Sequence, residues 1–159
     1  MPMFTPEKAL RDFPKTPVIL SAILQSVDQR RAQEARDGAD GWNVLEVVCH
    51  LNDFEQIFFD RARRIVETDL PRLESVDQNA LVRDNRYAEQ SLAEALASYL
   101  SRRRAFIAFL RGLSAEQWQR KGIHYASGEV TLVDFVTNTT LHDVNHIGQI
   151  LNALGSAPF

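Results

Sequence analysis

The fold of this chain is read most directly from residues 43–65, which run NVLEVVCHLNDFEQIFFDRARRI. Asn43 is a favoured residue for a helix N-cap, and the apolar residues after it recur every three or four positions. This spacing predicts an amphipathic helix that runs from Asn43 to about Thr68 and buries one apolar stripe. The stripe consists of Val44, Val47, Leu51, Phe54, Phe58 and Ile65.

A shorter apolar stretch precedes this helix, in residues 16–27. Thr16 is a favoured N-cap residue, and Pro17 suits the first helical position, where its missing N–H costs nothing. These residues predict a helix that begins after Thr16 and ends before the turn formers of residues 37–41. Its buried face is expected to carry Ile19, Ile23 and Val27.

Two further helices are predicted in the C-terminal half. Ser91 opens a capping-box pattern before a helix that reaches about Gly112. After a predicted loop at residues 121–130, Thr131 is the expected N-cap of a last helix, which Gly155 terminates. The apolar seam of that last helix is expected to consist of Val133, Val136, Val144, Ile147, Leu151 and Leu154.

Length and composition fit one domain built from these four helices. The chain has 159 residues, of which 45% are hydrophobic, and this is enough for one core. Residues 69–87 show little periodicity and form a connection longer than the usual links of a bundle. We therefore predict an all-α fold: a four-helix bundle that forms a single domain over residues 1–159, with a long connection between the second and third helices.

Charge and cysteine content argue against several classes of protein. Lys and Arg total 18 against 21 Asp and Glu, so no positive surplus favours nucleic acid, and the basic cluster 102–104 is expected to be a solvated face. The one cysteine excludes an internal disulfide, and a cytoplasmic location is expected. The longest apolar run, residues 18–24, contains Ser21 and is too short to span a bilayer, so no membrane partner is predicted.

His142 and His146 are four residues apart on the last predicted helix. Their side chains leave the same face, about 5 to 6 Å apart at Cβ, which is close enough to share one metal ion. Such a pair also occurs as an ordinary exposed or interface feature, and the motif alone does not distinguish this from a metal site. His50 lies at the border between the apolar and polar arcs of its helix, as the pair does on the last helix, so all three could face one cleft.

Three neutral imidazoles would leave one coordination position of the metal open. Catalytic sites use this arrangement, in which the metal lowers the pKa of a water or of a substrate thiol. Two neighbours are not counted among the site residues. Cys49 points about 100° away from His50 and is expected to pack as a small side chain, and Asp143 points away from both rings and is not assigned as a general base.

Two parts of the chain resemble the DinB-like superfamily of damage-inducible four-helix proteins. The first is residues 42–51, followed by Asp53, Glu55 and Arg61. The second comprises residues 113–118, 122–124, 128, 131–132 and 142–147. The resemblance implies that His50, His142 and His146 bind one divalent metal, that the helices run up-up-down-down, and that the protein forms a homodimer.

The resemblance also implies that the protein is a metal-dependent enzyme that acts on a small-molecule substrate. Some relatives are thiol-dependent transferases or isomerases, in which the metal activates a low-molecular-weight thiol, so thiol S-transfer is placed ahead of hydrolysis. The alternative is a non-catalytic metal- or ligand-binding stress-response module, because no clear general base accompanies the histidines. Zinc and nickel are the expected ions, although imidazole also suits copper and iron.

His124 and Arg61 are the candidate catalytic residues. His124 lies in the predicted loop before the last helix, where it could carry a proton at the open metal position or only hydrogen-bond the end of the bundle. Arg61 lies on the His50 side of its helix and could meet an anionic substrate or pair with a buried carboxylate. For the nearby Arg64, a solvated surface position is preferred.

Overall fold

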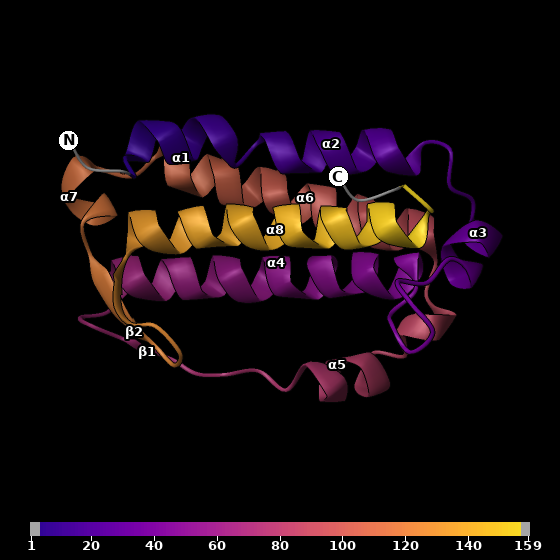
Figure 1. Ribbon diagram of the computed structural model, residues 1–159. Coiled ribbons are helices and arrows are strands. Elements are labelled where there is room, and N and C mark those ends of the chain that lie inside the picture. The colour runs from indigo at the N-terminus through magenta and orange to yellow at the C-terminus, as the bar shows by residue number, and fades with distance from the viewer. Residues whose placement is uncertain (1–3, 157–159) are drawn as a thin grey trace.

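The bundle consists of four helical segments that lie side by side in the computed structural model, which describes residues 4–156 (Figure 1). Two consecutive helices form the first segment, and one long helix forms each of the others, so the predicted four-helix bundle is confirmed. The single domain predicted for residues 1–159 stays a prediction, and its residues 1–3 and 157–159 lie outside the described range. The segments are α1 (Pro6–Asp12) with α2 (Lys15–Leu24), then α4 (Val44–Glu67), α6 (Leu92–Arg111) and α8 (Leu132–Ala153).

The α4 helix has the predicted cap and the predicted buried face. Asn43 Oδ1 accepts a hydrogen bond from the Glu46 backbone N–H at 2.8 Å, and Glu46 Oε2 accepts one from the Asn43 N–H at 2.8 Å. This capping box satisfies two backbone donors at the start of the helix. Every member of the predicted stripe is buried, as its spacing requires: Val44, Val47, Leu51, Phe54, Phe58 and Ile65.

The predicted start of the first helix was wrong, as was one of the three residues of its predicted face, whereas Ile23 and Val27 are half-buried and pack against the core. The α2 helix begins at Lys15, and its buried residues include Leu20 and Leu24, whereas Ile19 is 47% exposed. The reason is Thr16, which is buried and donates a hydrogen bond of 2.5 Å to Asp143 Oδ2 instead of capping the helix. A helix anchored through Thr16 turns the residues one and two turns further on toward the interior.

The last two helices begin where the sequence predicted. Ser91 caps α6 by accepting a hydrogen bond from the Glu94 N–H at 3.3 Å, and Thr131 forms a capping box at the start of α8. Gly155, with a φ of 88°, ends α8 in the left-handed region that favours glycine. One member of the predicted α8 seam faces outward, because Val144 is 50% exposed.

The helix directions differ from the expected up-up-down-down order. In Figure 1, α1, α2 and α8 run one way and α4 and α6 run the other, so the order is up-down-down-up. Contacts along α4 and α6 advance together, since Glu55 bonds Arg103 and Phe59 stacks on Phe106 with ring centroids 5.0 Å apart. Shorter links join antiparallel helices, whereas a parallel neighbour requires a connection that returns along the bundle. The long connection between α4 and α6 does this.

The segments expected to be loops contain short elements of their own. The predicted loop at residues 121–130 forms a β-hairpin, and a strand from the long connection pairs in parallel with the first strand of that hairpin. The resulting three-stranded sheet lies at one end of the bundle, as Figure 1 shows. These smaller elements are α3 (Gln29–Glu34), β1 (Arg72–Leu73), α5 (Gln78–Asp84), the 3-10 helix η1 (Tyr87–Glu89), α7 (Ala115–Trp118), β2 (Lys121–His124) and β3 (Gly128–Thr131).

Two apolar clusters fill the bundle, one toward each end. Leu45 and Tyr99 belong to the first, and Phe58 and Phe106 to the second. Within residues 4–156, none of the helices has the length and hydropathy needed to cross a membrane.

Candidate metal centre

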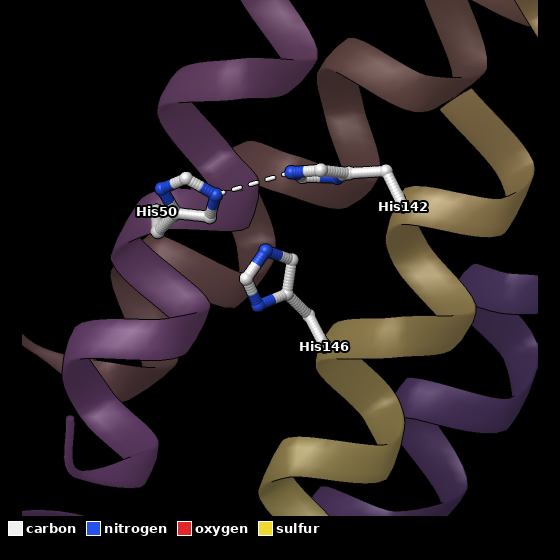
Figure 2. Close-up of side chains that lie close together, drawn as sticks. All are labelled: His50, His142 and His146. Atoms are coloured by element: carbon white, nitrogen blue, oxygen red, sulfur yellow. Dashed lines mark hydrogen bonds between the residues drawn. The ribbon is translucent and has the colours of Figure 1, made fainter. Parts of the chain in front are cut away.

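Three histidine rings from two helices meet between α4 and α8. His50 comes from α4, and His142 and His146 come from successive turns of α8 (Figure 2). One ring nitrogen from each lies within 4.8 Å of the other two. The Nε2 atoms of His50 and His142 are 3.1 Å apart. The structure therefore brings together the three side chains that the sequence analysis singled out.

Aromatic side chains hold the His50 and His142 rings in place. The His50 ring is only 1% exposed and lies between Trp42 and Phe54, at centroid distances of 5.0 and 4.3 Å. His142 contacts the Phe54 and Phe58 rings at 5.5 and 5.0 Å. His50 is thus a core residue and not a border residue, because the α4–α8 packing and Trp42 cover it.

The spacing of one pair of ring nitrogens matches that of two ligands on a tetrahedral metal ion. Zinc–nitrogen bonds of about 2.05 Å at tetrahedral angles place two ligand nitrogens roughly 3.3 Å apart. The separation between His50 Nε2 and His142 Nε2 is close to this value. Unlike His146, these two rings have a buried Nδ1 with no hydrogen-bond partner among the described residues, so aromatic packing rather than a hydrogen bond at Nδ1 orients them. The donor set consists of imidazole alone, which suits a divalent transition metal.

Gln149 fixes the orientation and tautomer of the third ring. Its Oε1 lies 2.9 Å from His146 Nδ1, and because an amide oxygen can only accept, Nδ1 donates a proton to it. In the neutral ring, Nε2 is then left with a free lone pair. A partner of this kind is typical of histidines that bind metals, and nothing in the sequence analysis had indicated Gln149.

Two of the three rings of the cluster are held in their neutral form. Burial, together with the nearby His146 and His142 rings, lowers the pKa of His50 to about 2. Burial and His142 lower the pKa of His146 to about 4. Both rings are therefore neutral at pH 7, so their lone pairs are free for a metal without prior loss of protons.

Behind His142 lies a fully buried ionic cluster that the sequence analysis missed. Arg103 donates from Nε and Nη2 to the Glu55 carboxylate, both at 2.7 Å, and from Nη2 to Asp143 Oδ2 at 2.7 Å. Its Nη1 donates to Thr16 Oγ1 at 3.0 Å. Residues 102–104 were expected to form a solvated face, and this prediction was wrong for Arg103, which is buried.

The signal for this inward arginine was present in the sequence. On α6, Arg103 lies four residues after Tyr99 and three before Phe106, so it shares their stripe, and both of those rings are fully buried. An arginine on an apolar stripe requires buried partners, which Glu55 and Asp143 supply. The Asp143 carboxylate is directed to Arg103, and its Oδ1 is 4.0 Å from His142 Nδ1.

A pocket of about 320 Å³ opens beside the histidine cluster, with His142 in its wall. His124 on β2 and Arg61 on α4 line the same pocket, so the structure places both candidate catalytic residues near the cluster. His124 Nδ1 accepts a hydrogen bond from the Ala126 N–H at 3.4 Å. Burial and the charge of Arg61 lower the pKa of His124, which favours its neutral form.

The other residues weighed from the sequence lie away from the pocket. Arg64 is exposed and donates to the Arg72 carbonyl at 2.7 Å. Cys49 is fully buried, as predicted for a packed side chain, and burial raises the pKa of its thiol to about 12. Its Sγ lies 3.5 Å from Gln90 Oε1, outside the histidine cluster.

The fold and the histidine cluster together define a four-helix-bundle protein with a candidate metal centre. The family model described as the DinB superfamily matches residues 13–150. Because this match spans most of the 159 residues, the chain belongs to the DinB superfamily. The resemblance seen in the sequence is thereby confirmed.

Among solved structures, the chain is similar to YfiT from Bacillus subtilis, described as "a probable metal-dependent hydrolase with an unusual four-helix bundle topology". The TM-score is 0.83 at 21% sequence identity, and the match covers 93% of this chain and 85% of the YfiT chain. At this identity the likeness shows the shared fold. No match was found among curated proteins.

Proposed function

We propose that the protein binds one divalent transition metal, zinc or nickel, through His50, His142 and His146 and uses it to catalyse a reaction of a small molecule. The observation that carries this proposal is the convergence of three imidazole nitrogens within 4.8 Å, with one ring in the wall of a pocket. Membership of the DinB superfamily and the description of YfiT support a metal-dependent role. Three protein ligands leave a position for a substrate or a nucleophile.

The composition of the pocket wall favours a thiol as the nucleophile. A metal ion at the centre would lower the pKa of a thiol or a water held at its open position. A thiol starts from a pKa of about 8.5 and a bulk water from about 15.7, so a thiol needs far less help from a base. None of the described residues that line the pocket is an aspartate or glutamate. We therefore place S-transfer from a low-molecular-weight thiol ahead of hydrolysis.

His124 is the proposed proton carrier. It lines the pocket together with His142 and favours the neutral form, which can accept a proton from an incoming thiol or water. Its hydrogen bond to the Ala126 N–H fixes Nδ1 as an acceptor, so in the neutral ring Nε2 carries the proton. Uptake of a proton at Nδ1 therefore requires this hydrogen bond to break, after which the charged ring can give up a proton from Nε2.

Metal content tests the first part of the proposal. Protein purified without an affinity tag should contain about one zinc or nickel per chain by elemental analysis, and His142→Ala should lose most of it. His124→Ala, which changes a pocket histidine outside the cluster, should keep its metal. Wild-type protein that holds no stoichiometric metal after reconstitution at neutral pH contradicts the proposal.

Activity assays separate the candidate reactions. Metal-loaded protein would be incubated with small thiols and an electrophilic aryl or alkyl halide, and in parallel with simple esters and amides without a thiol. Thiol-dependent and metal-dependent turnover supports S-transfer, whereas turnover without thiol supports a metal-dependent hydrolase. Metal binding with neither activity would favour the alternative of a non-catalytic stress-response module.

A further inference from the structure

The side chain of Arg61 is a buried cation that has no carboxylate partner among residues 4–156. It is 6% exposed, and one of its nitrogens, Nη2, donates to the Glu74 backbone carbonyl. Within residues 4–156 it forms no ion pair with a carboxylate, and its Nε and Nη1 have no hydrogen-bond partner. Arg103, the other deeply buried arginine, has two carboxylates. Arg61 therefore lacks the carboxylate partners that Arg103 has, while its Nε and Nη1 are not fully buried and can be reached by a ligand.

The pocket is where the missing charge can be supplied. Arg61 lines it, and the described lining contains no acidic side chain. A buried charge without a partner is costly, and here burial lowers the pKa of Arg61. An anionic group of a ligand in the pocket would offset that cost through charge-assisted hydrogen bonds.

The pocket wall also indicates the shape of such a ligand. Phe54 and Phe58 of α4 lie between His50 and Arg61 along one helix, and Phe135 and Val130 complete an apolar middle section. His142, the cluster ring in the pocket wall, lies against Phe54 and Phe58, at ring-centroid distances of 5.5 and 5.0 Å. Arg61 follows Phe58 by about 4.5 Å along the helix axis at 1.5 Å per residue. A ligand that reaches both Arg61 and His142 passes over these rings and therefore has an apolar body.

We propose that the pocket binds a small carboxylate with an apolar body, whose carboxylate is held by Arg61 while the body lies against the phenylalanine rings. The opposite end of the molecule then points to His142. Only this last statement, which makes the ligand the substrate, rests on the proposed function. Recognition of the carboxylate by Arg61 is independent of a metal.

A matched pair of probes tests the assignment. The affinities of 4-phenylbutyrate and of its neutral amide would be measured by calorimetry on metal-free and on zinc-loaded protein. The carboxylate should bind at least about tenfold more tightly than the amide in both states, which is the range expected for hydrogen bonds to a charged group. Phenyl phosphate serves as a third probe, and tighter binding of this compound than of the carboxylate would overturn the assignment to carboxylates.

Variants assign the effect to one side chain. Arg61→Met should remove the discrimination between acid and amide, and Arg61→Lys should retain part of it. Arg64→Met, which changes an exposed arginine one turn away, should leave it unchanged. Equal affinity for both probes, or a preference for the acid that survives Arg61→Met in the folded variant, would overturn the proposal. Selectivity without any bound metal would uphold it even if the metal proposal failed.

Discussion

Arg103 of α6 and Glu55 of α4 form a two-point ion pair, with both N···O distances 2.7 Å and neither side chain in contact with solvent. The same guanidinium reaches Asp143, the residue after His142. This interaction links three helices beneath the histidine cluster. Its removal would leave two buried carboxylates with no cationic partner among the described residues around them.

We expect Arg103→Met to destabilise the fold by about 3–5 kcal/mol, the usual cost of breaking one side of a buried ion pair. Arg104→Met is the matched control, because Arg104 is exposed, and its effect should stay within about 0.5 kcal/mol. Urea unfolding monitored by circular dichroism measures both. Equal stability of the two variants would contradict the role given to Arg103.

Gln149→Leu should weaken metal binding by about 10- to 100-fold, because His146 loses the acceptor that holds its Nδ1 proton. Gln149→Glu should preserve or raise the affinity, since a carboxylate accepts the same proton more strongly. Competition with a chromophoric chelator gives the affinities. Asn152→Ala, an exposed change on the same helix, is the control. Identical affinities for all three variants would rule out the orienting role.

Metal-free protein should lose stability as the pH falls below about 6.5. Burial lowers the pKa of His50 to about 2 in the folded state, whereas the unfolded chain binds a proton near the ordinary value of 6.5. Below that value the unfolded state therefore binds more protons, which costs up to about 1.4 kcal/mol of stability per pH unit for this residue. Above it the effect disappears.

The contribution of His50 can be isolated with His50→Asn. Metal-free wild-type protein and this variant would be unfolded with urea at several values between pH 7 and pH 5. The stability of the wild-type protein should fall more steeply over this interval. Parallel curves would show that His50 is not the group responsible.

Two glycines should respond to alanine in opposite directions. A Cβ at residue 122 would lie 3.1 Å from Ile65 Cγ1 and 3.2 Å from the Pro71 carbonyl oxygen, so Gly122→Ala should cost about 1–3 kcal/mol. A Cβ at residue 148, within α8, meets nothing within 4 Å, so Gly148→Ala should stabilise by about 0.5–1 kcal/mol. Thermal unfolding of both variants and of the wild-type protein measures the change in melting temperature. A change of the same sign in the two variants would contradict this prediction.

We also propose that the protein forms a homodimer through α2 and α8, two neighbouring helices that expose large apolar side chains. Val18 and Ile19 of α2 and Leu141 and Val144 of α8 are between 47% and 68% exposed. Light scattering after gel filtration should show a dimer for the wild-type protein and a monomer for Val18→Glu combined with Leu141→Glu. Leu70→Glu, an exposed apolar residue elsewhere, should remain a dimer. A wild-type monomer would end this proposal.

Local sequence patterns determined most of the helices and part of the site. The caps Asn43, Ser91 and Thr131 begin helices at the predicted positions, because a capping side chain and the backbone groups it satisfies are close in sequence. The spacing of His142 and His146 likewise placed both rings on one face of α8, which follows from the 3.6-residue turn. Only short-range geometry is involved in each case.

The tertiary structure decided which distant side chains meet and which way each helix runs. Thr16, Arg103 and Asp143 come from three helices, and their mutual contacts turned Ile19 outward and Arg103 inward. The pairing of β2 with β3 made a hairpin from an expected loop, the parallel pairing of β1 with β2 joined it to the long connection, and His124 on β2 lies in the pocket wall. The sequence could identify His50 as a partner for the α8 pair, but the antiparallel packing of α4 on α8 sets the 3.1 Å approach to His142. Long-range packing and buried charge pairing fix these features, because their free energy depends on residues far apart in the chain.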